Sequence, residues 1–198
     1  MTDLFFSLVV FALLSTLSPG GATSLATASG AQFGYKKTIP LIGGIALTLA
    51  LLVAISSTGL SAAILVFPVL EAGMKAVGTI YLLWLAFIIL KAGAPKSTDV
   101  SETNPIGFIG GSMLLIINPK AWAMAVGVTG SFSSISDNSF TLAIIFGCVF
   151  AVTATLSLSI WTLTGSILGK MIKADWEWHL FNFIMAFLLT LSIASFWL

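Results

Sequence analysis

Charged residues are scarce in this sequence, and arginine is absent altogether. Charged side chains make up 8% of the 198 residues and hydrophobic ones 58%, whereas soluble domains carry roughly 25% charged residues. Eight lysines supply all the positive side-chain charge, and the net charge is +1. This composition excludes a basic patch for nucleic acid and an acidic tail, and it predicts an integral membrane protein surrounded mainly by lipid.

Cysteine and histidine occur once each, as Cys148 and His179. A single cysteine excludes an intramolecular disulfide. One histidine gives no Ser/His/Asp or Cys/His arrangement for an enzyme. A metal-cation or other small-ion transporter stays open as the alternative function, although such a site would have few ligands. Residues 165–170 read GSILGK and lack the spacing of a P-loop. We therefore expect no enzyme activity, no cofactor and no bound metal.

Six long apolar runs organise the chain. A helix needs about 20 residues to cross the hydrocarbon core of a bilayer. Runs near that length occupy residues 4–29, 39–57, 74–92, 106–129, 139–166 and 179–198. The first run has no basic flank and continues beyond Pro19, so we interpret it as a span rather than a signal peptide. The sequence thus predicts an all-α integral membrane protein with six transmembrane helices.

Lysine pairs indicate which loops face the cytoplasm. They lie in alternate loops, as Lys36 and Lys37, Lys91 and Lys96, and Lys170 and Lys173. Cytoplasmic loops of membrane proteins carry an excess of positive residues. We therefore expect these three loops to lie inside and both termini to lie outside.

The most polar stretch of the chain, residues 95–104, divides it into two halves. Each half, residues 1–94 and residues 105–198, contains three predicted spans. An odd number of crossings reverses the orientation of the second block, so a duplication here implies two inverted three-helix repeats joined by a cytoplasmic linker. Pro19 and Pro119, 100 positions apart, predict matching breaks in helices 1 and 4.

A proline inside a span frees backbone groups that lipid cannot satisfy, so each break should face protein or water. The helix that resumes after the break has exposed N–H groups and a positive dipole end, which attract carboxylates. We therefore predict substrate-binding residues at both breaks: Pro19, Gly20, Gly21, Asn118, Pro119 and Lys120. We expect the cavity to be lined as well by Thr16, Thr23 and Trp84.

Lys120 carries the one charge expected deep inside a span, because every acidic residue lies near a span end or in a loop. It can hold a substrate carboxylate and take part in proton coupling. Alternatively, it reaches an interface or covers carbonyls freed by Pro119. Asn118 is predicted to cap the helix that follows. Close helix packing is predicted at three spaced glycine pairs, Gly30 and Gly34, Gly107 and Gly111, and Gly165 and Gly169.

Three short motifs stand in the first, third and fourth spans: Ser18-Pro19-Gly20, Tyr81-Leu82-Leu83-Trp84-Leu85 and Asn118-Pro119-Lys120-Ala121. Together they resemble the lysine exporter family, the LysE/RhtB-type amino-acid exporters, and the resemblance covers nearly the whole chain. It implies a secondary exporter of amino acids or related small metabolites in the bacterial plasma (inner) membrane, driven by proton antiport. Its partners would then be the substrate, protons and membrane lipid, with no nucleic acid.

The charged residues inside the predicted spans also indicate which class of amino acid is transported. One candidate cation and no candidate anion lie inside the spans, so a carboxylate has a partner and a cationic side chain has none. We therefore expect neutral rather than basic amino acids. The particular solute and the oligomeric state stay open at this stage.

Overall fold

The computed structural model describes residues 2–59, 68–94 and 105–197, and every regular element in these ranges is a helix. The all-α prediction therefore holds for this part of the chain. The predicted linker between the halves, residues 95–104, lies outside the described residues.

The first helix break lies at the predicted proline. Helix α1 (Thr2–Leu17) ends just before it, and α2 (Gly21–Phe33) continues at an angle of 58°. Pro19 has no N–H to donate and disfavours helical backbone at the residue before it. The new helix is capped locally, because the Thr23 hydroxyl accepts a hydrogen bond from the Gly20 N–H at 2.8 Å. The prediction that helix 1 is broken at proline is confirmed.

The second break has the same form. Helix α6 (Phe108–Ile116) is followed by α7 (Pro119–Phe132) and a short 3-10 turn, η1 (Ser133–Ile135), and the two arms meet at 67°. The proline occupies the first position of α7, where an absent N–H costs nothing. Asn118 Oδ1 accepts from the Lys120 N–H at 3.0 Å. The predicted cap and the predicted break in helix 4 are both confirmed.

The remaining helices are α3 (Tyr35–Ser56), α5 (Pro68–Lys91), α8 (Ser139–Met171), α9 (Asp175–Leu191) and α10 (Ala194–Trp197). Three stretches are long and apolar enough to cross a membrane, namely Tyr35–Ser56, Ala72–Lys91 and Ser139–Met171. Counting each bent pair as one span raises the number to five among the described residues. The sixth predicted span corresponds to α9, which has 17 residues and stops at Leu191.

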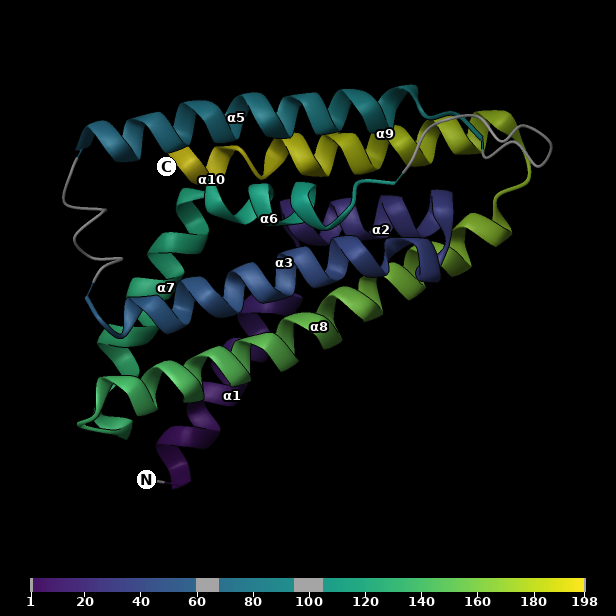
Figure 1. The fold of residues 1–198 in the computed structure, drawn as a ribbon. Coiled ribbons are helices and arrows are strands. Elements are labelled where there is room, and N and C mark those ends of the chain that lie inside the picture. The colour runs from purple at the N-terminus through teal and green to yellow at the C-terminus, as the bar shows by residue number, and fades with distance from the viewer. Residues whose placement is uncertain (1, 60–67, 95–104, 198) are drawn as a thin grey trace.

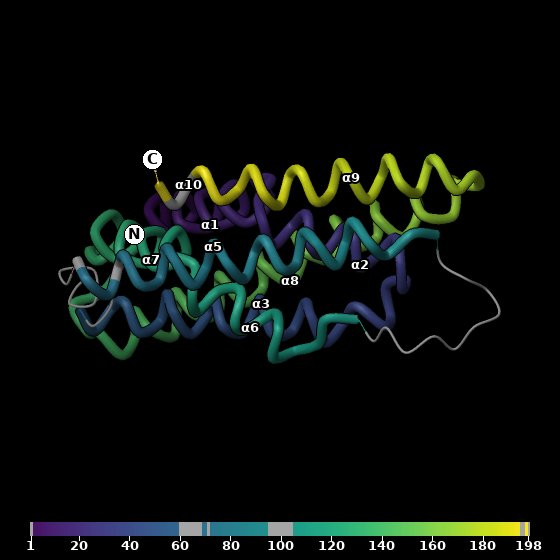
Figure 2. The backbone as a smooth tube through the Cα atoms, turned by 90° about the horizontal axis from the view of Figure 1, so that it is seen from above, coloured from purple at the N-terminus to yellow at the C-terminus, as the bar shows by residue number. Residues whose placement is uncertain are grey.

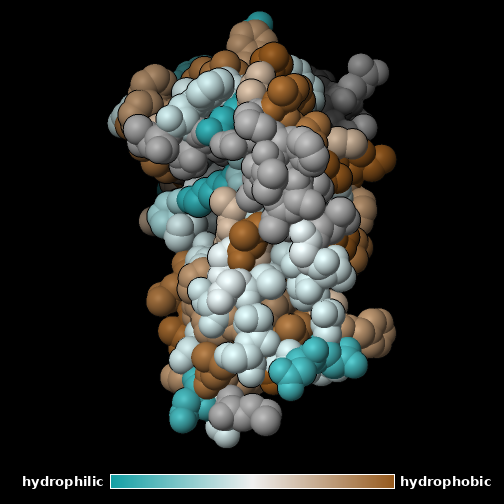
Figure 3. All heavy atoms as spheres, turned by 90° about the vertical axis from the view of Figure 1, so that its left-hand side faces the viewer, coloured by the Kyte–Doolittle hydropathy of each residue, from teal (hydrophilic) through white to brown (hydrophobic). Residues whose placement is uncertain are grey.

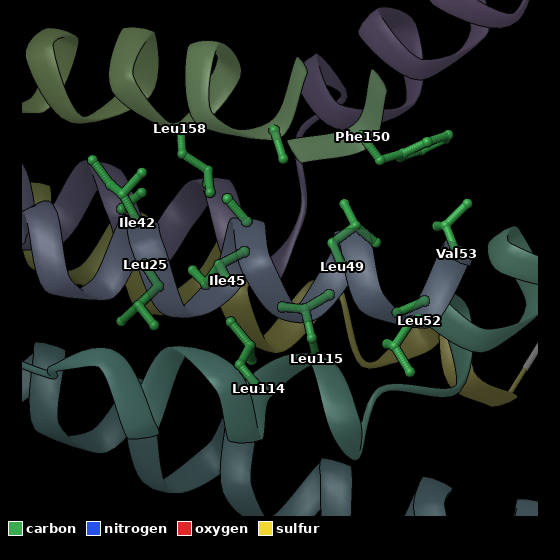
Figure 4. Close-up of a cluster of buried hydrophobic side chains, with 14 of the residues drawn as sticks. Leu25, Ile42, Ile45, Leu49, Leu52, Val53, Leu114, Leu115, Phe150 and Leu158 are labelled. Carbon is green, nitrogen blue, oxygen red and sulfur yellow. The ribbon is translucent and has the colours of Figure 1, made fainter. Parts of the chain in front are cut away.

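The helices pack in a reciprocal pattern. Helices α1 and α2 lie against α8, whereas α6 and α7 lie against α3, and α5 runs beside α9 (Figure 1). Helix α3 passes between α8 and α6, and apolar side chains from all three fill the space between them (Figure 4). This arrangement leaves the two helix breaks in the middle of the bundle.

Glycines allow the closest helix contacts. A Cβ at Gly30 of α2 would collide with a backbone oxygen of α8, and a Cβ at Gly165 of α8 would collide with one of α2. The predicted packing role is confirmed at Gly30, Gly111, Gly165 and Gly169. It is wrong at Gly34 and Gly107, where a Cβ would meet nothing within 4 Å. Gly34 instead has a φ of 78° and makes the turn between α2 and α3.

The two ends of the bundle differ. Both termini lie at one end (Figures 1 and 2), together with the end of α3 and the start of α8. Figure 3 looks onto this end, where pale and hydrophilic residues cover much of the lower part of the face. The start of α3 and the ends of α5 and α8, which carry Lys36, Lys37, Lys91 and Lys170, lie at the opposite end. Lys96 lies outside the described residues, and the side of the membrane that each end faces stays a prediction.

Candidate functional site

The two helix breaks line a single cavity of about 110 Å³. The first break contributes Ser18, Pro19, Gly20 and Gly21. The second break contributes Asn118, Lys120 and Ala121. Segments far apart in the sequence therefore meet at one place, and both α2 and α7 begin at the cavity.

The rest of the lining combines apolar side chains with hydroxyl groups. The apolar side chains are Ile45, Leu49, Leu115, Met124, Ala154 and Leu158, from α3, α6, α7 and α8. Several of them belong to the buried cluster between α3, α6 and α8 (Figure 4). The hydroxyls come from Ser15, Thr16, Ser18, Thr23 and Ser192. The cavity thus offers both polar and apolar groups to a small solute.

The fixed charges around the cavity are all positive. Lys120 is the charged side chain among the described lining residues, and no carboxylate is among them. Within the described part of the chain, its ammonium group has no hydrogen-bond or ion-pair partner. The N-termini of α2 and α7 add their partial positive charges at the same place. Such a site favours an anionic group such as a carboxylate.

Most of the predicted site residues lie together at this cavity. Pro19, Gly20, Gly21, Asn118, Lys120, Thr16 and Thr23 all line it. Pro119 is buried at the start of α7 and does not. Trp84 also lies elsewhere, because its side chain is 52% exposed and stacks on Tyr81 with the ring centres 5.6 Å apart. The structure therefore joins the two break segments but does not bring Trp84 to them.

Ser192 is a lining residue that the sequence analysis missed. Helix α9 ends at Leu191, and the turn that follows brings Ser192 to the cavity. Its hydroxyl oxygen lies 3.1 Å from the position that a Cβ at Gly21 would occupy. No proline or glycine marks this turn, so the sequence carries no signal for a third interrupted helix.

Other side chains cover the carbonyls that the breaks set free. Trp161 Nε1 donates to the Leu17 carbonyl at 3.2 Å, and Ser157 Oγ donates to the carbonyl of the preceding residue at 2.6 Å. At the second break, Trp122 Nε1 donates to the Ile116 carbonyl at 2.8 Å. These three carbonyls therefore have donors other than Lys120, which is an exposed residue.

The sequence of the whole chain matches a known family. A family model described as LysE type translocator matches residues 13–196. This chain belongs to the LysE type translocator family. The resemblance seen in the three motifs is thereby confirmed. Members of this family are transporters, so the expectation that the chain is not an enzyme is confirmed as well.

Several relatives of this LysE-family chain are efflux proteins. A cysteine/O-acetylserine efflux protein of Escherichia coli O1:K1 / APEC is 23% identical over 164 residues, which cover 82% of this chain and 83% of the relative. The protein of the same name from Salmonella typhimurium is 24% identical over the same shares. No solved structure matches the chain significantly. Family membership and the long apolar helices identify a multi-pass membrane transporter.

Metal ligands are dispersed in this LysE-family chain. Among the described residues, no three His, Cys, Asp or Glu side chains gather as a metal site would require. Cys148 and His179 are both exposed, on α8 and α9 respectively. The cavity at the helix breaks is therefore the site on which a function is best argued.

Proposed function

We propose that this LysE-family protein exports small neutral amino acids, with cysteine and O-acetylserine as the first candidates, in exchange for protons. One observation carries the proposal, namely that residues at the N-termini of α2 and α7, with the exposed Lys120 among them, line the same cavity. Each helix N-terminus acts like roughly half a positive charge. The three groups together would bind a substrate carboxylate, and none of the described lining residues is acidic and able to pair with a cationic side chain.

The size and the walls of the cavity support a small substrate. Its volume of about 110 Å³ is well below the roughly 300–1,000 Å³ of pockets for drug-sized ligands. The apolar lining residues from α3 and α8 suit a short uncharged side chain, while the hydroxyl groups suit the polar ends of an amino acid. The two relatives named as cysteine/O-acetylserine efflux proteins agree with such a substrate.

The reciprocal packing supports two inverted repeats, residues 1–94 and residues 105–198. The broken pair of each half lies against the long second helix of the other half, α8 or α3. The third helices, α5 and α9, lie against each other. Packing of each half against helices of the other half is expected when two inverted repeats interlock. Rocking of one repeat against the other would then open the central cavity to each side of the membrane in turn.

The charge pattern supports an orientation in the bacterial inner membrane. We expect the lysine-bearing end in the cytoplasm and both termini outside. Export would then carry the substrate from the lysine-bearing end toward the end that holds the termini. In this proposal Lys120 binds the carboxylate and takes part in proton coupling.

The direct test is counterflow in proteoliposomes with labelled cysteine, O-acetylserine, alanine, lysine and arginine. We expect exchange of the small neutral amino acids and little exchange of lysine or arginine. Selective exchange of the basic amino acids would contradict the proposed substrate class.

The role of Lys120 is tested by Lys120→Met, which keeps the length of the side chain and removes its charge. Loss of a charge-assisted contact is expected to lower transport by roughly 10- to 100-fold, as a loss of about 1.5–3 kcal/mol predicts. Lys170→Met is the matched control, because Lys170 is exposed at the end of α8 and away from the cavity. Unchanged transport with normal proton coupling in Lys120→Met would remove Lys120 from the site.

A further inference from the structure

Two tryptophans perform the same task at the two helix breaks. Trp161 Nε1 donates to the carbonyl of Leu17, the last residue of α1, at 3.2 Å. Trp122 Nε1 donates to the carbonyl of Ile116, the last residue of α6, at 2.8 Å. In each case an indole N–H takes the place of the N–H four residues further on, which would bond this carbonyl in a continuous helix.

These bonds are expensive to lose. The last carbonyls of a helix have no partner inside the helix, and the apolar interior of a membrane offers no water to replace one. Tryptophan can satisfy such a carbonyl in an apolar setting, since its one polar atom is the donor and the rest of the ring is hydrophobic. The two indoles therefore satisfy the last carbonyl of each first arm.

Neither tryptophan lines the cavity, so neither is placed to bind the substrate directly.

The two tryptophans lie on different helices relative to the break that each one serves. Trp122 belongs to α7 and reaches back over its own break, whereas Trp161 belongs to α8 and links the break to another helix. One turn before Trp161, the fully buried Ser157 donates to the Thr16 carbonyl at 2.6 Å. The end of α1 is thus held by two adjacent turns of α8.

We propose that Trp161 and Trp122 are positioning residues for transport. Their indole N–H groups hold the ends of α1 and α6, and so set the direction in which α2 and α7 present their N-termini to the cavity. The inference rests on the proposed function, because positioning matters only if a solute binds between those N-termini. Ser157 assists Trp161 at the first break.

Hydrogen exchange of the purified protein tests the positioning without any substrate. Trp161→Phe and Trp122→Phe keep an aromatic ring and remove the N–H. We expect amide exchange to become roughly tenfold faster or more in residues 18–24 for the first variant and in residues 117–123 for the second. Trp176→Phe is the matched control, since Trp176 is 67% exposed at the start of α9 and does not line the cavity. Unchanged exchange at both breaks would overturn the proposal.

Transport kinetics separate positioning from general damage to the fold. With cysteine and O-acetylserine as probes, we expect the KM of each variant to rise roughly tenfold while the maximal rate changes less. A lower maximal rate with an unchanged KM would overturn the positioning role, because it indicates fewer folded molecules with an intact site. Trp176→Phe should keep the KM of the unaltered protein.

Two further outcomes are decided by the same design. If the unaltered protein moves none of the probes, the proposed function fails, and the exchange experiment still decides whether the tryptophans hold the breaks. If Trp161→Phe does not fold, Ser157→Ala tests the same strip of α8 with a smaller change. That variant should speed exchange in residues 18–24, and exchange at the normal rate there would contradict the proposal for the first break.

Discussion

At the scale of single residues, Gly20 offers the sharpest probe of the cavity. It lines the cavity, its φ of −179° is extended backbone open to any residue, and nothing lies within 4 Å of a Cβ built there. Gly20→Ala should therefore fold normally and place a methyl group beside the cavity. A misfit of one methylene group in a binding pocket is worth roughly 10- to 200-fold in discrimination. We expect a fall in transport efficiency of about tenfold, measured as maximal rate over KM in proteoliposomes.

Gly127→Ala provides the comparison for this change. Gly127 lies on α7, does not line the cavity, and likewise has nothing within 4 Å of an added Cβ. Transport by this variant should equal that of the unaltered protein. Equal transport by Gly20→Ala at every substrate concentration would show that the solute does not approach Gly20.

At the scale of the helices, the contact between α2 and α8 depends on the absence of a side chain at Gly165. A Cβ there would collide with the backbone carbonyl of Thr27, and neither backbone can yield without moving the helices apart. Overpacking of this kind costs about 1–3 kcal/mol. We expect Gly165→Ala to lower the thermal unfolding temperature in detergent, measured by fluorescence. Gly130→Ala, where a Cβ meets nothing within 4 Å, should not lower it, and an equal Tm for both variants would contradict the packing argument.

The same helices show what the sequence can and cannot predict. Pro19 and Pro119 locate the breaks because proline removes a donor wherever it stands in a helix. Gly165 and Gly30 indicate close packing because spaced small residues let backbones approach. Trp161 could not be assigned from the sequence, since only the folded bundle brings α8 beside the end of α1. The cavity position expected for Trp84 depended on which face of α5 turns inward, and that face is set by packing against α9.

At the scale of the whole molecule, the start of α3 and the ends of α5 and α8, which carry Lys36, Lys37, Lys91 and Lys170, lie at the end of the bundle opposite to the termini. The cavity lies between the two broken helices, and the charge of Lys120 stands beside it. If the lysine-bearing end faces the cytoplasm, the membrane potential acts along the direction of export. The direction and the size of that effect can then be calculated for exchange of one proton against one neutral zwitterion.

Such an exchange moves one net positive charge inward for each substrate exported, so export should respond to the membrane potential. One elementary charge crossing 100 mV gains about 2.3 kcal/mol, which corresponds to roughly fiftyfold accumulation. In vesicles whose lumen corresponds to the outside of the cell, a lumen-positive diffusion potential of about 100 mV should therefore concentrate O-acetylserine in the lumen by that factor. An acidic lumen should add to the effect, because protons leave the lumen as substrate enters. Accumulation that follows the pH gradient but ignores the potential would contradict the one-proton exchange, since it would show that no net charge crosses the membrane.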